Sequence, residues 1–396
     1  MRDTTRQVKL LIQENIHRKN RSLQQILAYL LGAFCLLLNT TLGSLCYAQT
    51  PDTTPAIPQQ SSSLLTSTLH EGRTRPVVAI IAENRFTELT DYVIPYSILK
   101  QADIAEVYAL GMQEGVIQMF PALRLRAQFS AAQFDRLHPD GADYVIVPAV
   151  HYSADPALIS WIQAQAKKGA SIIGICDGVW VLANAGLLEN KRAVGHWHSF
   201  DDLSKQFPRT QFIKDKRYLA DGNIMTSTGV SASIPVSLAL VNVIAGEAKT
   251  QALADELDIP KWDDEHRSAD FKLSAKHMWT ASINWLTFWG KDKFMVSLAN
   301  DIDELSLALM ADAYARTYRS SVFSFARAPV TSLRGLQIVP DHDVATNDAP
   351  VLSLPAKLIP GRGLDWILQQ IALRYDERTA SFVALQMEYP YHPARK

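Results

Sequence analysis

Cysteine is scarce in this sequence. The 396 residues contain three cysteines, and two of them, Cys35 and Cys46, lie within the first 48 residues. Cys176 is therefore the single thiol of the remaining chain, which cannot form an internal disulfide. A solitary thiol in an oxidising compartment is either buried and inert or kept for its reactivity.

Several motifs with a defined chemistry are also missing. The sequence has no Walker loop, no G-x-S-x-G, no G-x-G-x-x-G after a strand and no cysteine-rich metal pattern. Each of these motifs would indicate a phosphate-binding, acyl-transfer or metal-binding site at a particular turn. We therefore expect neither a cofactor nor a metal.

Charge of one sign is not in excess. The chain holds 39 basic and 40 acidic residues, a net charge of −1. The first 22 positions carry six basic residues against two acidic ones, which leaves 33 basic and 38 acidic residues, or −5, for the rest. A mildly acidic body without a basic stripe excludes binding to a nucleic-acid backbone as its main role.

The basic N-terminus precedes an apolar run over residues 26–38 and a small-residue site, Cys46-Tyr47-Ala48, before Gln49. This order predicts that residues 1–48 are a cleaved signal peptide. An uncleaved anchor over residues 23–45 is the alternative. In both cases the body is exported, and it is periplasmic or anchored to the inner membrane facing the periplasm.

Residues 49–75 are rich in proline, serine, threonine and glutamine and read as a flexible linker. From residue 76 short apolar runs alternate with helical patterns. The runs are residues 77–81, 107–110, 144–147 and 171–175, and the helices include residues 91–100 and 156–168. This alternation predicts an α/β domain over residues 76–250, a flavodoxin-like sandwich with a mainly parallel sheet.

An internal repeat follows the first domain. Residues 294–341 repeat the order of elements expected for residues 77–126, and residues 359–390 echo residues 227–260. The part that carries Cys176 has no counterpart, so we expect residues 291–396 to be a truncated second copy of the same fold. Residues 251–290, which contain four tryptophans, read as a connector packed on the first domain.

One full and one partial copy in a single chain suggest an internal pseudo-dimer, and a homo-oligomer remains open.

Cys176 stands in the strongest local motif, Gly174-Ile175-Cys176-Asp177-Gly178, after an apolar strand and before a helical segment. A nucleophile on a sharp strand-to-helix turn is exposed to the cleft, and backbone N–H groups there can hold an anion. This placement predicts a lowered thiol pKa. A buried structural cysteine is the alternative.

Four ordered segments resemble the DJ-1/PfpI superfamily, within the class I glutamine amidotransferase-like fold. They are TELTDYVIPYSILK, GADYVIVPA, GASIIGICDGVWVLANAGLLENKRAVGHW and TSTGVSASIPVSLALV. The likeness is greatest to the branch found in AraC-type regulators, although no DNA-binding domain follows. The resemblance implies that Cys176 is the nucleophile, that Asp91 is the acid beside it, and that His196 is the site histidine.

A purely structural role remains an alternative for these residues. Glu88 is a nearby alternative to Asp91, which is equally suited to cap a helix N-terminus. His196 is equally explained as a hydrogen-bonded, partly buried side chain. The spacing of His196 and His198 would fit two ligands of one metal ion, but the sequence indicates no third ligand.

Two departures from the family pattern bear on activity. Pro148-Ala149-Val150 stands where many members have Pro-Gly-Gly, and Asp177 stands where many have a small neutral residue. Backbone donors for an oxyanion are expected at Asp177, Ala149 and Val150. A carboxylate next to the sulfur opposes thiolate formation.

Two functions remain in competition. The first is a cysteine-dependent hydrolase or lyase-type enzyme that acts through Cys176 on a small electrophile, such as an amide, a nitrile-like compound or an aldehyde. The second is a non-catalytic module that binds a small molecule or senses redox state.

Overall fold

The computed structural model describes residues 65, 69–286, 290–346, 349–355 and 359–392. The predicted signal or anchor segment, residues 1–48, and most of the linker lie outside the described residues. No helix in the described part is both long and apolar enough to cross a membrane.

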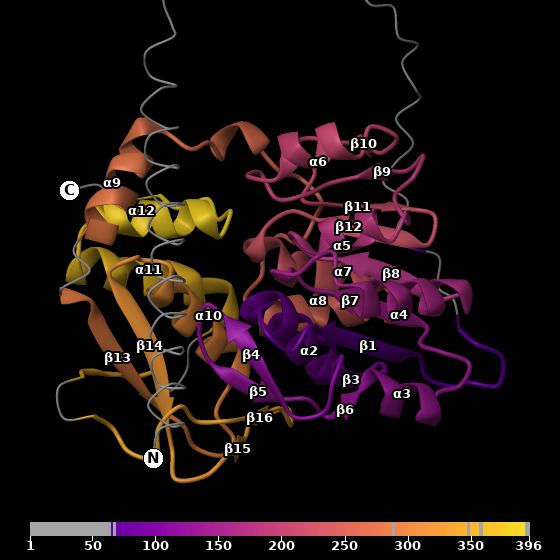
Figure 1. Ribbon diagram of the computed structural model, residues 1–396, viewed down its shortest axis with the longest axis horizontal. Helices are drawn as coiled ribbons and strands as arrows, with labels where there is room; N and C mark the ends of the chain where they lie inside the picture. Colours follow the sequence, from indigo (N-terminus) through magenta and orange to yellow (C-terminus); the bar gives the residue numbers. More distant parts are fainter. Residues whose placement is uncertain (1–64, 66–68, 287–289, 347–348, 356–358, 393–396) are drawn as a thin grey trace, which may run out of the picture. The chain divides into compact units, whose positions relative to one another are not determined.

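The first unit is built on a seven-stranded sheet with the order β11-β12-β8-β7-β1-β3-β6 (Figure 1). All neighbours are parallel except β11 and β12. Its strands are β1 (Val77–Ala82), β3 (Glu106–Gly111), β6 (Phe129–Ser130), β7 (Tyr144–Val147), β8 (Ser171–Gly174), β11 (Tyr218–Asp221) and β12 (Ile224–Ser227). The predicted α/β fold with a mainly parallel sheet is therefore confirmed.

Helices cover both faces of this sheet, which explains why its strands read as continuous apolar runs. The residues of β1 alternate between two cores: Val78 and Ile80 face one, and Ala79 and Ile81 face the other. The first core is covered by α2 (Leu89–Ala102), α7 (Ser233–Ala245) and α8 (Glu247–Glu256). The second is covered by α3 (Ala131–Leu137), α4 (Pro156–Lys167) and α5 (Gly178–Asn184).

A second, shorter α/β unit follows. Its sheet has the order β14-β13-β17, all parallel, which matches β3-β1-β7 of the first unit. The elements are β13 (Asp292–Ser297), α10 (Glu304–Ala315), β14 (Ser320–Phe325), β17 (Val351–Leu352), α11 (Pro360–Arg374) and α12 (Glu377–Gln386). In the described part of this unit the next element after β17 is α11, and this part contains no counterpart of the strands and helices that surround Cys176.

The two units are joined by strands and by helices. The hairpin of β4 (Val116–Phe120) and β5 (Arg124–Arg126) pairs with that of β15 (Val330–Thr331) and β16 (Gln337–Ile338), and β2 (Thr87–Glu88) completes the five-stranded sheet. Helix α2 packs against α10. The first core continues through these helices into the second unit, so both units share one apolar interior.

A smaller group of elements follows α5 in the first unit. It comprises β9 (Arg192–Ala193), α6 (Phe200–Gln206) and β10 (Gln211–Phe212), with β9 and β10 paired in parallel. Two single-turn 3-10 helices, η1 (Val230–Ala232) and η2 (Ser268–Asp270), complete the described elements of this region.

The connector contacts both units. Its first half lies on the first unit, where the N–H of Arg217 donates to the carbonyl of Asp264 at 2.7 Å. Its second half forms α9 (Ala275–Leu286), which packs on α12 of the second unit. The expectation that this segment packs on the first domain is therefore wrong for α9, because Asn284 finds its hydrogen-bond partner at the carbonyl of Thr317, 2.9 Å away.

Since the interior is continuous, a cavity made in the second unit is expected to destabilise the first as well. Ile367→Ala on α11 removes a fully buried side chain and should lower the free energy of unfolding by about 2–5 kcal/mol. Urea titrations should show this loss with far-UV circular dichroism and, at the same midpoint, with the accessibility of Cys176 to a thiol reagent. Leu373→Ala, on the same helix but 81% exposed, should change stability by less than about 0.5 kcal/mol. Separate midpoints for the two probes would contradict a shared core.

Candidate active site

Cys176 lies on the turn between β8 and α5. Its φ of 54° is in the left-handed region, which a side chain with a Cβ adopts at a cost. Gly178 makes this turn feasible, since a Cβ there would lie 2.1 Å from the carbonyl oxygen of Val147. The cysteine is therefore held at the carboxyl end of the central sheet on a strained turn, the position expected of it from the sequence. Only 7% of its surface is exposed.

Asp91 lies in the first turn of α2 and is fully buried. Its carboxyl group accepts hydrogen bonds from the N–H of Ala149 and from the hydroxyl of Ser233, both at 3.2 Å. It does not cap the helix: the N-cap position belongs to Glu88, whose side chain makes no capping bond. Burial raises the pKa of Asp91 to about 8, so its carboxyl group is mainly protonated at neutral pH.

The backbone donor expected at Ala149 is engaged, because its N–H points to Asp91. It is therefore not a free oxyanion donor. The backbone N–H of Asp177 interacts with the sulfur of Cys176 and lowers its pKa. Val150 follows the same turn, is 8% exposed and forms an antiparallel bridge with Thr87. Backbone N–H groups therefore interact with both functional groups of the site, that of Ala149 with the carboxyl group of Asp91 and that of Asp177 with the thiol of Cys176.

The thiol pKa is raised, and the prediction that the turn lowers it is wrong. Burial raises the pKa of Cys176 well above its usual value, and the charges of Asp91, Asp177 and Glu88 raise it further. The N–H of Asp177 acts in the opposite direction but is outweighed. A buried thiolate would be shielded from water and repelled by the neighbouring carboxyl groups, so the neutral thiol is the favoured form.

The second unit supplies a cation beside this site. Arg316, at the end of α10, binds Glu88 at 2.6 Å and Asp312 at 2.5 Å. Asp312 also accepts a hydrogen bond from the hydroxyl of Thr90 at 3.0 Å. The charge of Arg316 lowers the pKa of Asp91 and so offsets part of the effect of burial. The first unit alone would leave Glu88 without its cation. Apart from its position in the repeat, nothing in the sequence indicated that Arg316 lies beside the site.

His196 is buried against Gln386 and Glu388, near the C-terminus. Its Nε2 lies 3.3 Å from the carbonyl oxygen of Gln386, and its Nδ1 accepts from the N–H of His198 at 3.4 Å. This network assigns the proton to Nε2 and leaves neither ring nitrogen free. His196 also contacts the ring of Trp197, with the ring centroids 5.4 Å apart, and Glu388, 4.0 Å away. These contacts fit the hydrogen-bonded, partly buried side chain that the sequence left open.

Glu388 was not singled out by the sequence, yet it organises this second cluster. Its side chain accepts from the N–H of Gly229 at 2.7 Å and pairs with Nε2 of His266 at 2.8 Å. A Cβ at Gly229 would lie 2.7 Å from both Glu388 and His196, which requires glycine there. Glu388 has a φ of 53°, and its strained backbone is held by these contacts. No group of three or more metal-ligating side chains occurs in the described part of the chain.

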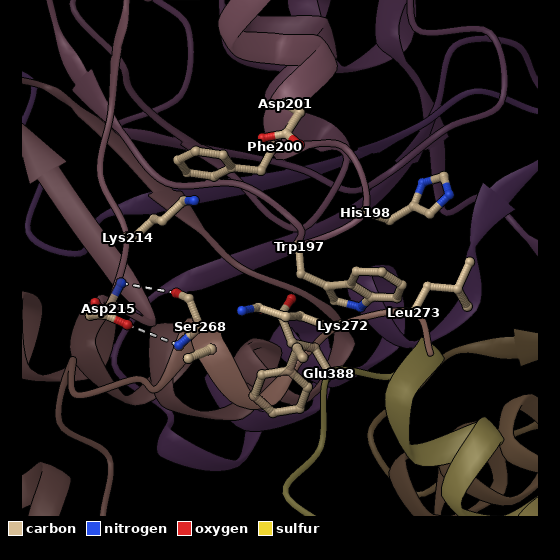
Figure 2. A pocket seen from close by; sticks show the side chains of 12 residues that line it. Trp197, His198, Phe200, Asp201, Lys214, Asp215, Ser268, Lys272, Leu273 and Glu388 are labelled. Carbon is tan, nitrogen blue, oxygen red and sulfur yellow. Dashed lines mark hydrogen bonds between the residues drawn. The ribbon is translucent and has the colours of Figure 1, made fainter. Parts of the chain in front are cut away.

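A cavity of about 470 Å³ opens next to this cluster (Figure 2). Figure 2 shows aromatic and charged side chains around it, with Asp215 and Ser268 hydrogen-bonded to each other at its edge. Its lining includes Trp197, His198, Phe200, Lys214, Phe271 and Glu388. Cys176 does not line this cavity.

Residues 76–243 match the DJ-1/PfpI family, so the chain contains a DJ-1/PfpI family domain. The matched range coincides with the first unit, from the start of β1 to α7. It includes Asp91, Cys176 and His196, whereas Arg316 and Glu388 lie outside it.

Curated relatives match parts of this domain. The HTH-type transcriptional regulator CdhR of Pseudomonas aeruginosa is 36% identical over 86 residues, which are 22% of this chain and 25% of that protein. Isonitrile hydratase of Pseudomonas putida is 33% identical over 104 residues, 26% of this chain and 44% of that protein. The chain therefore spans less than half the length of either relative.

Solved structures are similar at lower identity. Drosophila melanogaster DJ-1beta has a TM-score of 0.42 and 20% identity, and covers 47% of this chain and 100% of its own. A THiJ/PfpI family protein from Pseudomonas syringae has a TM-score of 0.45 and 17% identity, and covers 61% of this chain and 93% of its own.

The raised thiol pKa can be measured by the pH dependence of alkylation. Asp177→Asn removes a negative charge beside the sulfur and should lower the apparent pKa of Cys176 by about one unit, at the lower end of the range for a neighbouring charge. Iodoacetamide labelling followed by mass spectrometry would measure it. Asp202→Asn, whose side chain is 73% exposed on α6, should leave the profile unchanged. An Asp177→Asn profile identical to wild type would mean that the carboxyl group does not act on the thiol.

The buried acid should also shape the dependence of stability on pH. Because the pKa of Asp91 is about 8 in the folded protein and about 3.9 when unfolded, the folded state holds a proton that the unfolded state releases. This contribution to stability is present below about pH 4 and is lost as pH rises to about 8. Asp91→Asn should flatten that decline in urea titrations. A parallel decline in both proteins would show that Asp91 is ionised in the native state.

Proposed function

We propose that this protein is a cysteine-dependent enzyme that adds water to a small, uncharged electrophile with a carbon–nitrogen multiple bond, such as an isonitrile. The observation that carries the proposal is that a neutral thiol and a protonated carboxyl group, Cys176 and Asp91, occupy one buried site. The similarity to isonitrile hydratase supports the choice of substrate class. Burial disfavours charged substrates, so an uncharged one fits this site.

The proposed reaction begins when the sulfur of Cys176 bonds to the terminal carbon of the isonitrile. Asp91 donates its proton to the same carbon, and the thiol proton returns to the carboxylate, so no net charge develops in the dry site. Water then adds to the thioimidate carbon, the carbon–sulfur bond breaks and a formamide leaves. The sulfur regains a proton in this last step, which restores the starting site.

The supporting residues act through the acid. Ser233 and Ala149 hold the carboxyl group of Asp91 in place, and Arg316 keeps its pKa from rising further. The backbone N–H of Asp177 favours negative charge on the sulfur and so stabilises the partial charge that the sulfur carries while its bond to carbon forms or breaks. The second unit therefore contributes to the proposed chemistry from outside the DJ-1/PfpI domain.

A binding or redox-sensing module is the second candidate. It is favoured by the 7% exposure of Cys176 and by the position of the 470 Å³ cavity, which the thiol does not line. Relatives such as CdhR are transcriptional regulators. In this alternative a small molecule occupies the cavity beside His198 and Glu388, and Cys176 does not turn it over.

We also propose that the protein works outside the cytoplasm. This part of the proposal rests on the basic and apolar pattern of residues 1–48 alone. Fractionation of cells that express the full chain, with protease treatment of spheroplasts, would place the body on one side of the inner membrane.

The enzymatic proposal predicts formamide production from a small alkyl isonitrile, measured by mass spectrometry. Cys176→Ser should remove turnover, and Asp91→Asn should lower it by about 100-fold or more, the usual contribution of a positioned acid. Leu137→Ala, exposed on α3, serves as the control and should retain full activity. Equal product from wild type and Cys176→Ser would refute cysteine catalysis. Ligand-induced stabilisation that survives in Cys176→Ser, without turnover, would favour the binding module.

A further inference from the structure

Helix α9 has its polar side turned inward and its apolar side turned outward. Thr280 and Asn284 are buried, and the amide of Asn284 donates to the carbonyl of Thr317 and to the hydroxyl of Thr379. Figure 1 shows this helix beside α12. The exposed large apolar residues here are Leu273, Met278, Trp279, Ile283, Trp285 and Leu286, with exposed fractions between 39% and 64%. We call this group the α9 face.

The α9 face is continuous rather than scattered. At 100° per residue, the outward side chains of α9 span about half of the helix circumference, and the exposed polar residues among them are Ser282 and, at the edge beside Ile283, Lys276. Surface helices ordinarily present the opposite arrangement, with the apolar stripe on the core. An exposed apolar patch of this kind marks an interaction surface.

The charge around the α9 face differs from that of the rest of the body. Between residues 267 and 293 there are five basic residues and two acidic ones, Asp270 and Asp292. Asp292 is paired with Arg374, and Asp270 is paired with Arg267. The basic residues are Arg267, Lys272, Lys276, Lys291 and Lys293. The chain after residue 22, by contrast, carries a net charge of −5.

We propose that the α9 face docks on the surface of an anionic lipid bilayer. Tryptophan and leucine on one face of a helix with flanking lysines are the composition of helices that lie in the membrane interface, where basic residues meet lipid phosphates. The N-terminal part of the same chain has a basic segment before an apolar run, which favours a bilayer over other occupants. Docking would orient the body on the membrane independently of any chemistry at Cys176.

The test uses the full chain with Cys35→Ser and Cys46→Ser, so that Cys176, which is buried, is the only remaining native thiol. Met278→Cys, 52% exposed on the α9 face, carries an environment-sensitive maleimide dye. The matched control is Leu137→Cys, 54% exposed on α3. Both proteins keep the same N-terminal segment, so a difference between them reports on α9.

With phosphatidylglycerol-containing vesicles, the dye at position 278 should shift to shorter wavelength and be quenched by lipid nitroxides, while the dye at 137 should not. Pure phosphatidylcholine vesicles should give a smaller shift at 278. No shift at 278 would overturn the proposal. A shift that depends on protein concentration without lipid would assign the α9 face to a second copy, and a dye already shielded without lipid at any dilution would assign it to the chain's own N-terminal segment. Equal shifts in both lipids would remove the role of charge.

Discussion

The packing of α2 against α10 is the contact on which the rest of the structure depends. It brings together helices separated by some two hundred residues of chain, and it encloses the buried Glu88 and Asp312 and the partly buried Arg316 between them. Buried charges are costly unless they are paired, and this group is stable only when both helices are in register. Thr90 and Ser97 of α2 add hydrogen bonds to Asp312 and Glu304 of α10. The contact therefore fixes the relative position of the two units and completes the surroundings of the site.

Exclusion of water is the second factor, and it determines the ionisation of the site. The thiol of Cys176 and the carboxyl group of Asp91 are both more stable in their neutral forms here, because water is excluded and three carboxyl groups lie close together. The strained turn positions the sulfur, but position alone does not create a thiolate. A site of this kind favours the transfer of protons between neutral partners over the attack of a preformed anion.

The second unit has a role distinct from that of a duplicate domain. Its described residues include no counterpart of the part of the fold that carries Cys176. At the position of Asp91 the repeat has Leu307, a buried apolar residue. It supplies Arg316 to the thiol site and the carbonyl of Gln386 and the carboxyl group of Glu388 to the cluster around His196. It also carries α9 on its outer side through Asn284.

The sequence alone determined the α/β class, strands β1, β3, β7 and β8, the repeat and the turn that holds Cys176, because hydrophobic periodicity and glycine placement are local properties of the chain. It also put Asp91 and His196 forward, through the order of motifs. Only the tertiary structure decided the ionisation of the thiol and the engagement of Ala149, which depend on burial and on carboxyl groups from separate segments. The contributions of Arg316 and Glu388 and the outward apolar side of α9 were likewise beyond the sequence, since each depends on which distant element packs against it.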